Sequence, residues 1–250
     1  MKIIIAPAKK MIVDMDTFDP LSSPEYLSRT REILKVMQQL SYENAKVLWK
    51  CSDKIAKPNY DWLQQLQLDR QLTPAILSFS GIQYQYMAPD LFTAPALDYI
   101  QENLRVMSGF YGILRPFDGI VPYRLEMQAR LSVNNTKSLY EFWGDHLYQA
   151  LHFNEGPVVN LASKEYAKAV TPYLQQDDQF IDIVFGHWVN DQLKTRATFA
   201  KMARGAMVRY MAEHNIMTID GIKAFDHPDY TFKAELSTDT KLVFVHTNHN

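Results

Sequence analysis

Cysteine is nearly absent from this chain of 250 residues, because Cys51 is the only one. A single thiol excludes an intramolecular disulfide and any zinc site built on several cysteines. Long apolar runs are also lacking: the apolar stretch Ile3–Ile5 ends at Pro7, and no segment approaches the roughly 18 apolar residues of a membrane span. We therefore expect a cytoplasmic protein with no signal peptide and no membrane segment.

A surplus of charge is lacking as well. The chain has 26 Lys and Arg residues against 28 Asp and Glu residues, a formal net charge of −2. The bulk charge therefore gives no sign of nucleic-acid binding, which would need a local basic patch.

Familiar catalytic motifs are missing too. The sequence contains neither G-x-S-x-G nor H-E-x-x-H, and Gly109 and Gly112 form only a bare G-x-x-G. The seven histidines are dispersed, so we predict no metal site and no resident cofactor, and we assign no catalytic residue.

The composition is that of a globular protein, with 47% apolar and 12% aromatic residues and no linker or repeat. We therefore expect a single domain over residues 1–250. Strands are expected at 3–5, 157–161, 180–185, 193–196, 230–236 and 241–246, with the last four forming two hairpins. Helices are expected from Ser23, from Ser41 to before Pro58, and over 62–68, 75–79 and 198–214. This order predicts an α+β fold, a central mixed sheet surrounded by helices.

Three segments hold residues that point to function. The first, Ala6–Lys10, follows the first strand, and loops at the carboxyl ends of strands commonly present ligand-binding lysines. Lys9 and Lys10 are the candidates there, and the alternative is a solvated turn.

The second segment, Leu104–Met127, places charged residues among glycines, prolines and apolar residues. Charges in apolar surroundings are costly unless they are paired. Arg115 and Arg124 therefore indicate either an anion site or an internal ion pair, in which Arg124 would pair with Glu126 or Asp118.

The third segment is the helix over 198–214. Its apolar residues fall on one stripe, and Lys201 and Arg204 fall on the opposite side with Gly205 among them. A solvated basic face explains this pattern. Gly205 favours another explanation, because glycine in a helix suits the close approach of a ligand or of another backbone.

These segments resemble the YaaA family, bacterial proteins of peroxide stress resistance, over nearly the whole chain. The resemblance rests on several unusual motifs in the same order: Pro7-Ala8-Lys9, Ser52-Asp53-Lys54, Leu104–Met127, Tyr140–Asp145, Asn160–Tyr166 and Ala203-Arg204-Gly205.

The resemblance implies an α+β fold with a positively charged cleft and a helix-hairpin-helix element that binds double-stranded DNA. It also implies protection against hydrogen peroxide by limiting iron-mediated oxidative damage. The cleft residues that it implies are Lys9, Lys54, Arg115, Arg124 and Arg204, with Lys10 and Lys201 as neighbours.

Two positions depart from the family pattern. Ala6 stands where the family commonly has serine, and the expected hairpin reads Phe79-Ser80-Gly81-Ile82-Gln83-Tyr84 where the family tends to have Phe-Lys-Gly-Asp-Val-Tyr. Gly81 still allows backbone N–H groups to meet a phosphate, but the loss of a lysine removes one neutralising charge. Binding to DNA should therefore be weaker and less dependent on salt.

Two further activities are open. An enzyme acting on a small anionic or nucleotide-like substrate in the same cleft would suit charges embedded in a rigid apolar segment. Direct iron binding is disfavoured, because no cluster of carboxylates and histidines has ligand spacing.

Overall fold

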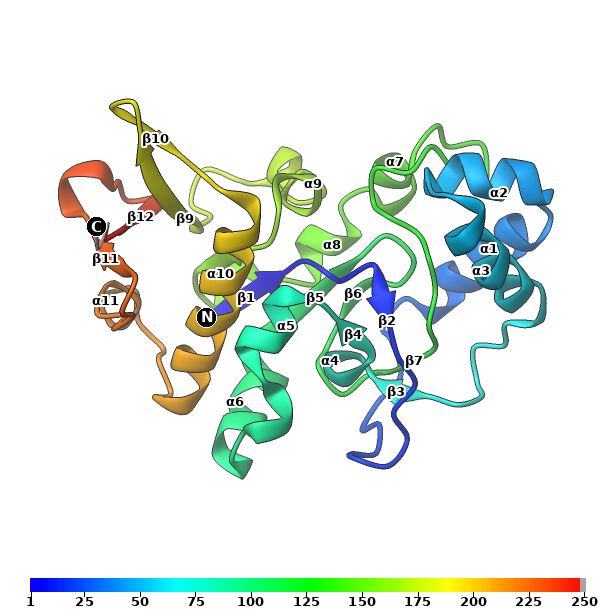
Figure 1. The fold of residues 1–250 in the computed structure, drawn as a ribbon, viewed down its shortest axis with the longest axis horizontal. Helices are drawn as coiled ribbons and strands as arrows, with labels where there is room; N and C mark the ends of the chain where they lie inside the picture. Colours follow the sequence, from blue (N-terminus) through cyan, green and yellow to red (C-terminus); the bar gives the residue numbers. More distant parts are fainter. Residues whose placement is uncertain (248–250) are drawn as a thin grey trace.

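A mixed β-sheet organises the molecule, and the computed structural model describes residues 1–247 (Figure 1). The strands lie in the order β11-β12-β9-β8-β1-β5-β6, and β10 pairs with β9. The five strands from β12 to β5 are parallel, whereas β11, β6 and β10 run antiparallel to their neighbours. The bounds are β1 Lys2–Ile5, β5 Leu104–Ser108, β6 Gly112–Leu114, β8 Val158–Leu161, β9 Phe180–Val189, β10 Gln192–Lys194, β11 Tyr230–Phe232 and β12 Lys241–His246.

Strand β1 lies in the interior of the sheet, which explains its composition. It pairs with β5 on one side and β8 on the other, and Ile3, Ile4 and Ile5 are fully buried. Parallel strands covered on both faces are uniformly apolar rather than alternating. The N-terminal isoleucine run is therefore the centre of the core.

The order of the strands creates a crevice at the end of β1. The chain leaves β1 and returns as β5 on one side, and later returns as β8 on the other side. In open sheets of this kind, ligands bind outside the carboxyl ends of the strands where the connections diverge. The residues after Ile5 and after Leu161 therefore border a natural binding position.

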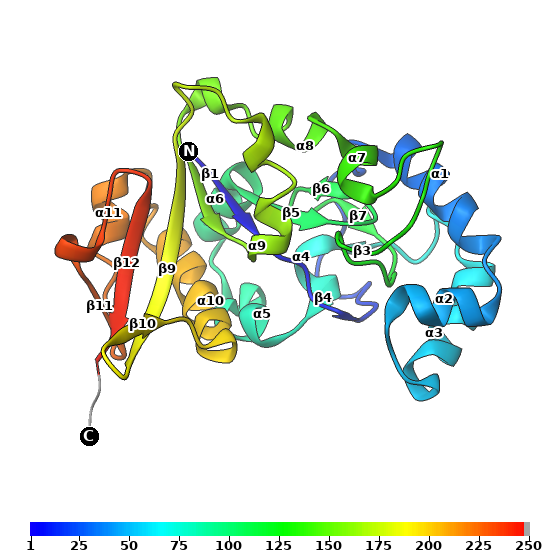
Figure 2. The ribbon, with the colours of Figure 1, turned by 90° about the horizontal axis from the view of Figure 1, so that it is seen from above.

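Helices of very different length surround the sheet. Figure 2 shows α1, α2 and α3 at one end of the molecule and α11 with β11 and β12 at the opposite end. The α-helices are α1 Leu27–Gln38, α2 Tyr42–Trp49, α3 Asp53–Gln65, α4 Ala75–Ser78, α5 Ile82–Met87, α6 Ala94–Asn103, α7 Leu139–Trp143, α8 His146–Gln149, α9 Lys164–Ala167, α10 Ala197–Glu213 and α11 Ile219–Lys223. The 3-10 turns are η1 Pro89–Leu91, η2 Phe153–Glu155, η3 Thr171–Tyr173 and η4 Ala234–Leu236.

Two short antiparallel pairs lie outside the main sheet. One joins β2 (Lys10–Met11) to β4 (Phe79–Ser80), and the other joins β3 (Thr73–Pro74) to β7 (Gly119–Ile120). The first pair places Lys10 opposite Ser80, which ties the segment after β1 to the connection between α4 and α5.

Helix α10 packs against α5 through a glycine. A Cβ atom at Gly205 would lie 2.1 Å from the carbonyl oxygen of Gln83, and Gly205 is buried. Backbone therefore meets backbone here, as the glycine pattern suggested. The solvated basic face considered for this helix is wrong in part, because the side that bears Gly205 packs against α5 while Arg209 remains half-exposed.

The mixed sheet and α+β class are confirmed, and so are most expected elements. Strands β1 and β8, both hairpins in the second half and helix α10 lie close to their expected positions, and α4 covers residues 75–78.

The helices before residue 70 differ from the expectation. Lys50 adopts a left-handed conformation that ends α2, and α3 begins at Asp53 and continues through Pro58 to Gln65. Pro58 removes the bond to the carbonyl of Lys54, which is tolerated because both residues are exposed. At the first helix, a turn over 24–26 precedes α1, so the helix begins at Leu27 rather than next to Ser23.

Within residues 1–247, none of the helices has both the length and the apolar character needed to cross a membrane.

The contact at Gly205 yields a stability prediction. Gly205→Ala places a methyl group against the backbone of α5, so we expect the free energy of unfolding in urea to fall by about 3 kcal/mol, as for overpacked interiors. The control is Arg209→Ala on the same helix, where we expect a change below about 0.5 kcal/mol. A more stable Gly205→Ala protein, as helix propensity alone would give, contradicts the close contact.

Candidate functional site

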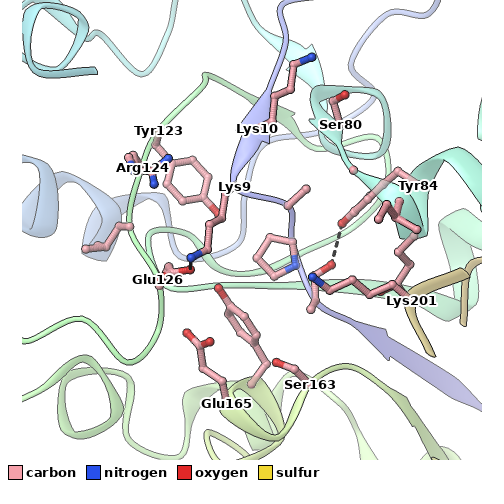
Figure 3. A pocket seen from close by; sticks show the side chains of 18 of the residues that line it. Lys9, Lys10, Ser80, Tyr84, Tyr123, Arg124, Glu126, Ser163, Glu165 and Lys201 are labelled. Atoms are coloured by element: carbon pink, nitrogen blue, oxygen red, sulfur yellow. Dashed lines mark hydrogen bonds and ion pairs between the residues drawn. The ribbon is translucent and has the colours of Figure 1, made fainter. Parts of the chain in front are cut away.

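A cavity of about 560 Å³ lies at the carboxyl ends of β1 and β8 (Figure 3). Its residues come from the segment after β1, the end of α2, the start of α5, the segment 123–128, the start of α9 and the middle of α10. The cavity therefore occupies the crevice that the strand order creates, and its size is that of a small-molecule site.

The segment after β1 supplies two lysines. Both Lys9 and Lys10 are exposed, and Lys9 Nζ lies 2.6 Å from Glu126 Oε1 in an ion pair. Tyr84 donates a hydrogen bond of 3.0 Å to the carbonyl of Ala6, which fixes the start of this segment against α5. Figure 3 shows Lys9 extending toward Glu126.

The segment 123–128 supplies Arg124 and Glu126 from the opposite wall. A Cβ atom at Gly109 would lie 2.8 Å from the carbonyl carbon of Glu126, so glycine after β5 lets this segment pass close to the sheet. Arg124 does not form the ion pair with Glu126 or Asp118 that the sequence allowed. It makes no hydrogen bond or ion pair with any residue from 1 to 247, and its Nε atom is buried.

Helix α10 supplies Lys201 and Arg204, which are three positions apart and therefore share a face. Lys201 is exposed, whereas Arg204 is half-buried and its Nε atom lacks a partner among the described residues. Burial lowers the pKa of the Arg204 guanidinium, and the negative charge of Asp182 partly opposes that change. The fold thus holds a cation here against an unfavourable environment.

Unpartnered donors are concentrated at this cavity. Six buried side-chain nitrogens have no hydrogen-bond partner within the described part of the chain, and four of them belong to cavity residues: Trp49, Gln83, Arg124 and Arg204. All four are N–H donors. Buried donors without acceptors cost stability, so their gathering among the residues that line one cavity marks that cavity as the candidate site.

The charge of the cavity is positive. Lys9, Lys10, Arg124, Lys201 and Arg204 give five cations, against the two carboxylates of Glu126 and Glu165. Glu165 is half-buried at the start of α9, where it accepts a hydrogen bond of 3.1 Å from the backbone of Gln128. Burial raises the pKa of the Glu165 carboxyl, and the nearby charge of Glu126 raises it further.

The structure brings together most of the residues singled out in the sequence. Lys9, Lys10, Gly81, Arg124, Lys201 and Arg204 line the cavity. Lys54 and Arg115 do not: Lys54 is exposed on the first turn of α3, and Arg115 makes an ion pair of 3.2 Å with buried Asp118 in a separate pocket. The internal pairing considered for this segment therefore applies to Arg115 rather than to Arg124.

The stretch expected to form the hairpin of a helix-hairpin-helix is residues 79–84, which comprise β4, Gly81 and the start of α5. The connection between α4 and α5 is not a free loop, because Phe79 and Ser80 pair with β2 and Phe79 is buried. Gly81 lies on the wall of the cavity and reaches an extended φ of −170°, which any residue can adopt. DNA binding by this segment stays a prediction.

Sequence reasoning missed several cavity residues. Glu165 and Ser163 follow β8 just as Lys9 follows β1, so the same loop argument could have found them. Trp49 and Gln83 carry no such signal, because only the folded chain brings the ends of their helices to the cavity.

The histidines also come closer together than the sequence suggested. His187 and His246 stack at 4.4 Å, and His227 contacts Tyr230 beside them. Even so, residues 1–247 contain no group of three or more histidine, cysteine or acidic side chains arranged to hold a metal ion.

The fold and the cavity together define an α+β protein with a cationic, donor-lined pocket at the carboxyl edge of a mixed sheet. Comparison with known proteins gives the family. A family described as "Peroxide stress protein YaaA" matches residues 1–236, so the chain belongs to this family.

Curated relatives cover nearly the whole chain. Proteins described as UPF0246 from Lactiplantibacillus plantarum and Lacticaseibacillus paracasei are 63% and 58% identical over 246 and 245 residues, which is 98% of this chain and 99% of each relative. A UPF0246 protein from Lachnoclostridium phytofermentans is 46% identical over 250 residues, covering all of this chain and 98% of the relative.

The position of Arg204 predicts a stabilising substitution. Arg204→Met keeps the aliphatic contacts and removes a buried donor without a partner, so we expect the free energy of unfolding to rise by about 1 kcal/mol. Urea unfolding at neutral pH measures the change, with exposed Lys54→Met as the control for replacing a cation by methionine. A loss of stability would show that the guanidinium has a stabilising partner in the folded protein.

Proposed function

We propose that this protein acts in peroxide stress by binding a small, acceptor-rich anion, such as a phosphorylated or carboxylated compound, in the cavity between β1, β8 and α10. Membership of the peroxide stress family supports the cellular role. The observation that supports the molecular activity is the gathering of four unpartnered buried donors, two of them arginines, at one cavity.

The chemistry of the donors favours an anion over a neutral ligand. Arginine guanidiniums bind phosphate and carboxylate groups through parallel N–H donors, and such charge-assisted bonds are stronger than neutral ones. Lys10 and Lys201, which are exposed and line the same cavity, would attract the ligand from solution. The proposal extends to an enzyme if the bound compound is also converted in this cavity.

Double-stranded DNA is the second candidate, and the exposed lysines Lys9, Lys10 and Lys201 favour it. They could contact backbone phosphates at the opening of the cavity without any readout of bases. Binding in this way would leave the half-buried arginines for a group that enters the cavity. Protection from iron-mediated damage would then follow from covering DNA or from chemistry on the small ligand.

Anion binding can be measured directly by titration calorimetry with pyrophosphate and with nucleotides. We expect Arg124→Ala to weaken binding at least tenfold, because a charge-assisted pair contributes about 1.5–3 kcal/mol. Arg204→Met should weaken binding equally, although we expect it to stabilise the empty protein.

Lys54→Ala is the matched control, since it removes an exposed cation that does not line the cavity. If no anion binds the unaltered protein, or if Lys54→Ala is as harmful as Arg124→Ala, the cavity is not the anion site.

DNA binding is tested separately by fluorescence anisotropy of a labelled duplex of about 30 base pairs over a range of salt concentrations. If DNA binds at the opening, the logarithm of affinity falls linearly with the logarithm of salt. We expect Lys201→Ala to reduce that slope by about one phosphate contact. Absence of binding at low salt would remove DNA as a candidate and leave the small anion.

A further inference from the structure

The cavity has two chemically different walls. Lys201 and Arg204 of α10 form one, which we call the basic wall. The carboxylates of Glu126 and Glu165 lie on the other, which we call the acidic wall and which also bears Arg124. In Figure 3, Glu126 and Glu165 lie near each other, and Lys201 lies across the view from them. A site for a simple anion has no need of a carboxylate, since like charges repel the ligand.

Glu165 is the member of the acidic wall that lacks a cationic partner. Glu126 is neutralised by Lys9 at 2.6 Å, but no lysine, arginine or histidine of residues 1–247 forms an ion pair with Glu165. Its carboxylate accepts a hydrogen bond from the backbone of Gln128, and the backbone of Met127 and the charge of Lys9 also lower its pKa. A half-buried carboxylate in this state has unused acceptor capacity facing the cavity.

The backbone around Glu165 is held in place, so its position is built into the fold. Tyr140 donates a hydrogen bond of 2.9 Å to the carbonyl of Glu165, and the contact with Gln128 joins α9 to the segment that bears Glu126. Burial raises the pKa of the Glu165 carboxyl, and the charge of the neighbouring Glu126 raises it further, because both disfavour the ionised form. A cationic group brought by a ligand would reverse that effect.

We propose that the ligand of this cavity is two-ended, with a phosphate or carboxylate against the basic wall and a protonated amine or other N–H donor against Glu165. This inference rests on the proposed function, since it specifies the ligand of the same site. Each wall then has a complementary partner, and a compound with only the anionic end leaves Glu165 unpaired.

The test compares two compounds that differ in a single group. O-phosphoserine and 3-phosphoglycerate have the same skeleton, with an amine in the first where the second has a hydroxyl. Binding is measured by titration calorimetry at pH 8 in the presence of EDTA, with pyrophosphate as a probe of the anionic end alone. We expect O-phosphoserine to bind about tenfold more tightly than 3-phosphoglycerate, because a charge-assisted hydrogen bond contributes about that factor.

Glu165→Gln supplies the decisive change. The substitution should weaken the binding of O-phosphoserine, because the amine of this ligand loses its charged partner. It should strengthen the binding of 3-phosphoglycerate and of pyrophosphate a few-fold, because the carboxylate that repels them is gone. Opposite shifts for two similar ligands cannot come from a general loosening of the fold. The control is Glu213→Gln, a carboxylate at the end of α10 that pairs with Arg209 away from the cavity and should change neither affinity.

Several outcomes would overturn the proposal. One such outcome is that pyrophosphate binds but O-phosphoserine binds no more tightly than 3-phosphoglycerate. Another is that Glu165→Gln leaves the preference for O-phosphoserine unchanged. In either case the ligand has no donor end at Glu165, whereas the anion site itself is retained. If none of the three compounds binds, the proposed function and this inference both fail. If added Mg²⁺ strengthens the binding of 3-phosphoglycerate and Glu165→Gln abolishes this increase in affinity, Glu165 holds a divalent cation instead of an amine.

Discussion

Two contacts between backbone segments, each made at a glycine, determine the cavity. Gly205 lets α10 lie against the carbonyl of Gln83, and Gly109 lets the segment of Glu126 pass beside the end of β5. Arg204 is the neighbour of the first glycine, and Arg124 lies two positions before the residue that meets the second. A side chain at Gly205 would shift Arg204, and a side chain at Gly109 would shift Arg124, away from the opposite side of the cavity. The placement of the cations therefore depends on the absence of two Cβ atoms.

This arrangement lowers the stability of the folded protein, and the loss of stability points to a role for these residues other than folding. Arg124 and Arg204 have side-chain donors without a partner among residues 1–247, and Glu165 has no ion pair there. A sequence selected for stability alone would replace such groups. Buried Asp118, by contrast, accepts hydrogen bonds from Ser22 and from Arg115, and the remaining two of the six unpartnered nitrogens in the described chain, on Arg29 and His246, lie outside the cavity. The concentration of unpartnered donors at the cavity is therefore the observation on which the proposed ligand rests.

The sequence predicted the elements whose causes are local. An isoleucine run indicates an interior strand, a polar turn between apolar segments indicates a hairpin, and the period of residues 198–214 indicates a helix. The break at Lys50 and the continuation through Pro58 were missed, because a left-handed residue and an exposed proline leave the apolar pattern unchanged.

Some of the candidate site residues that line the cavity follow a strand end or lie on α10. Lys9 and Arg204 are such residues, and both line the cavity. Lys54 and Arg115 are cations of equal prominence in the sequence, yet their elements face elsewhere. Charge and motif alone cannot show which wall a residue reaches, since that depends on contacts such as that of Gly205 with α5. Trp49 and Gln83 were missed for the same reason.

The two candidate ligands use different layers of one site. Exposed lysines at the opening suit phosphates on the outside of a duplex, where the interaction is long in range and weakened by salt. The arginines and Glu165 lie deeper, are half-buried, and include both signs of charge. A polyanion that remains outside gains nothing from Glu165, whereas a compound that enters can meet both walls. The acidic wall is therefore the feature that separates the two activities, and it favours a small ligand with opposite groups at its ends.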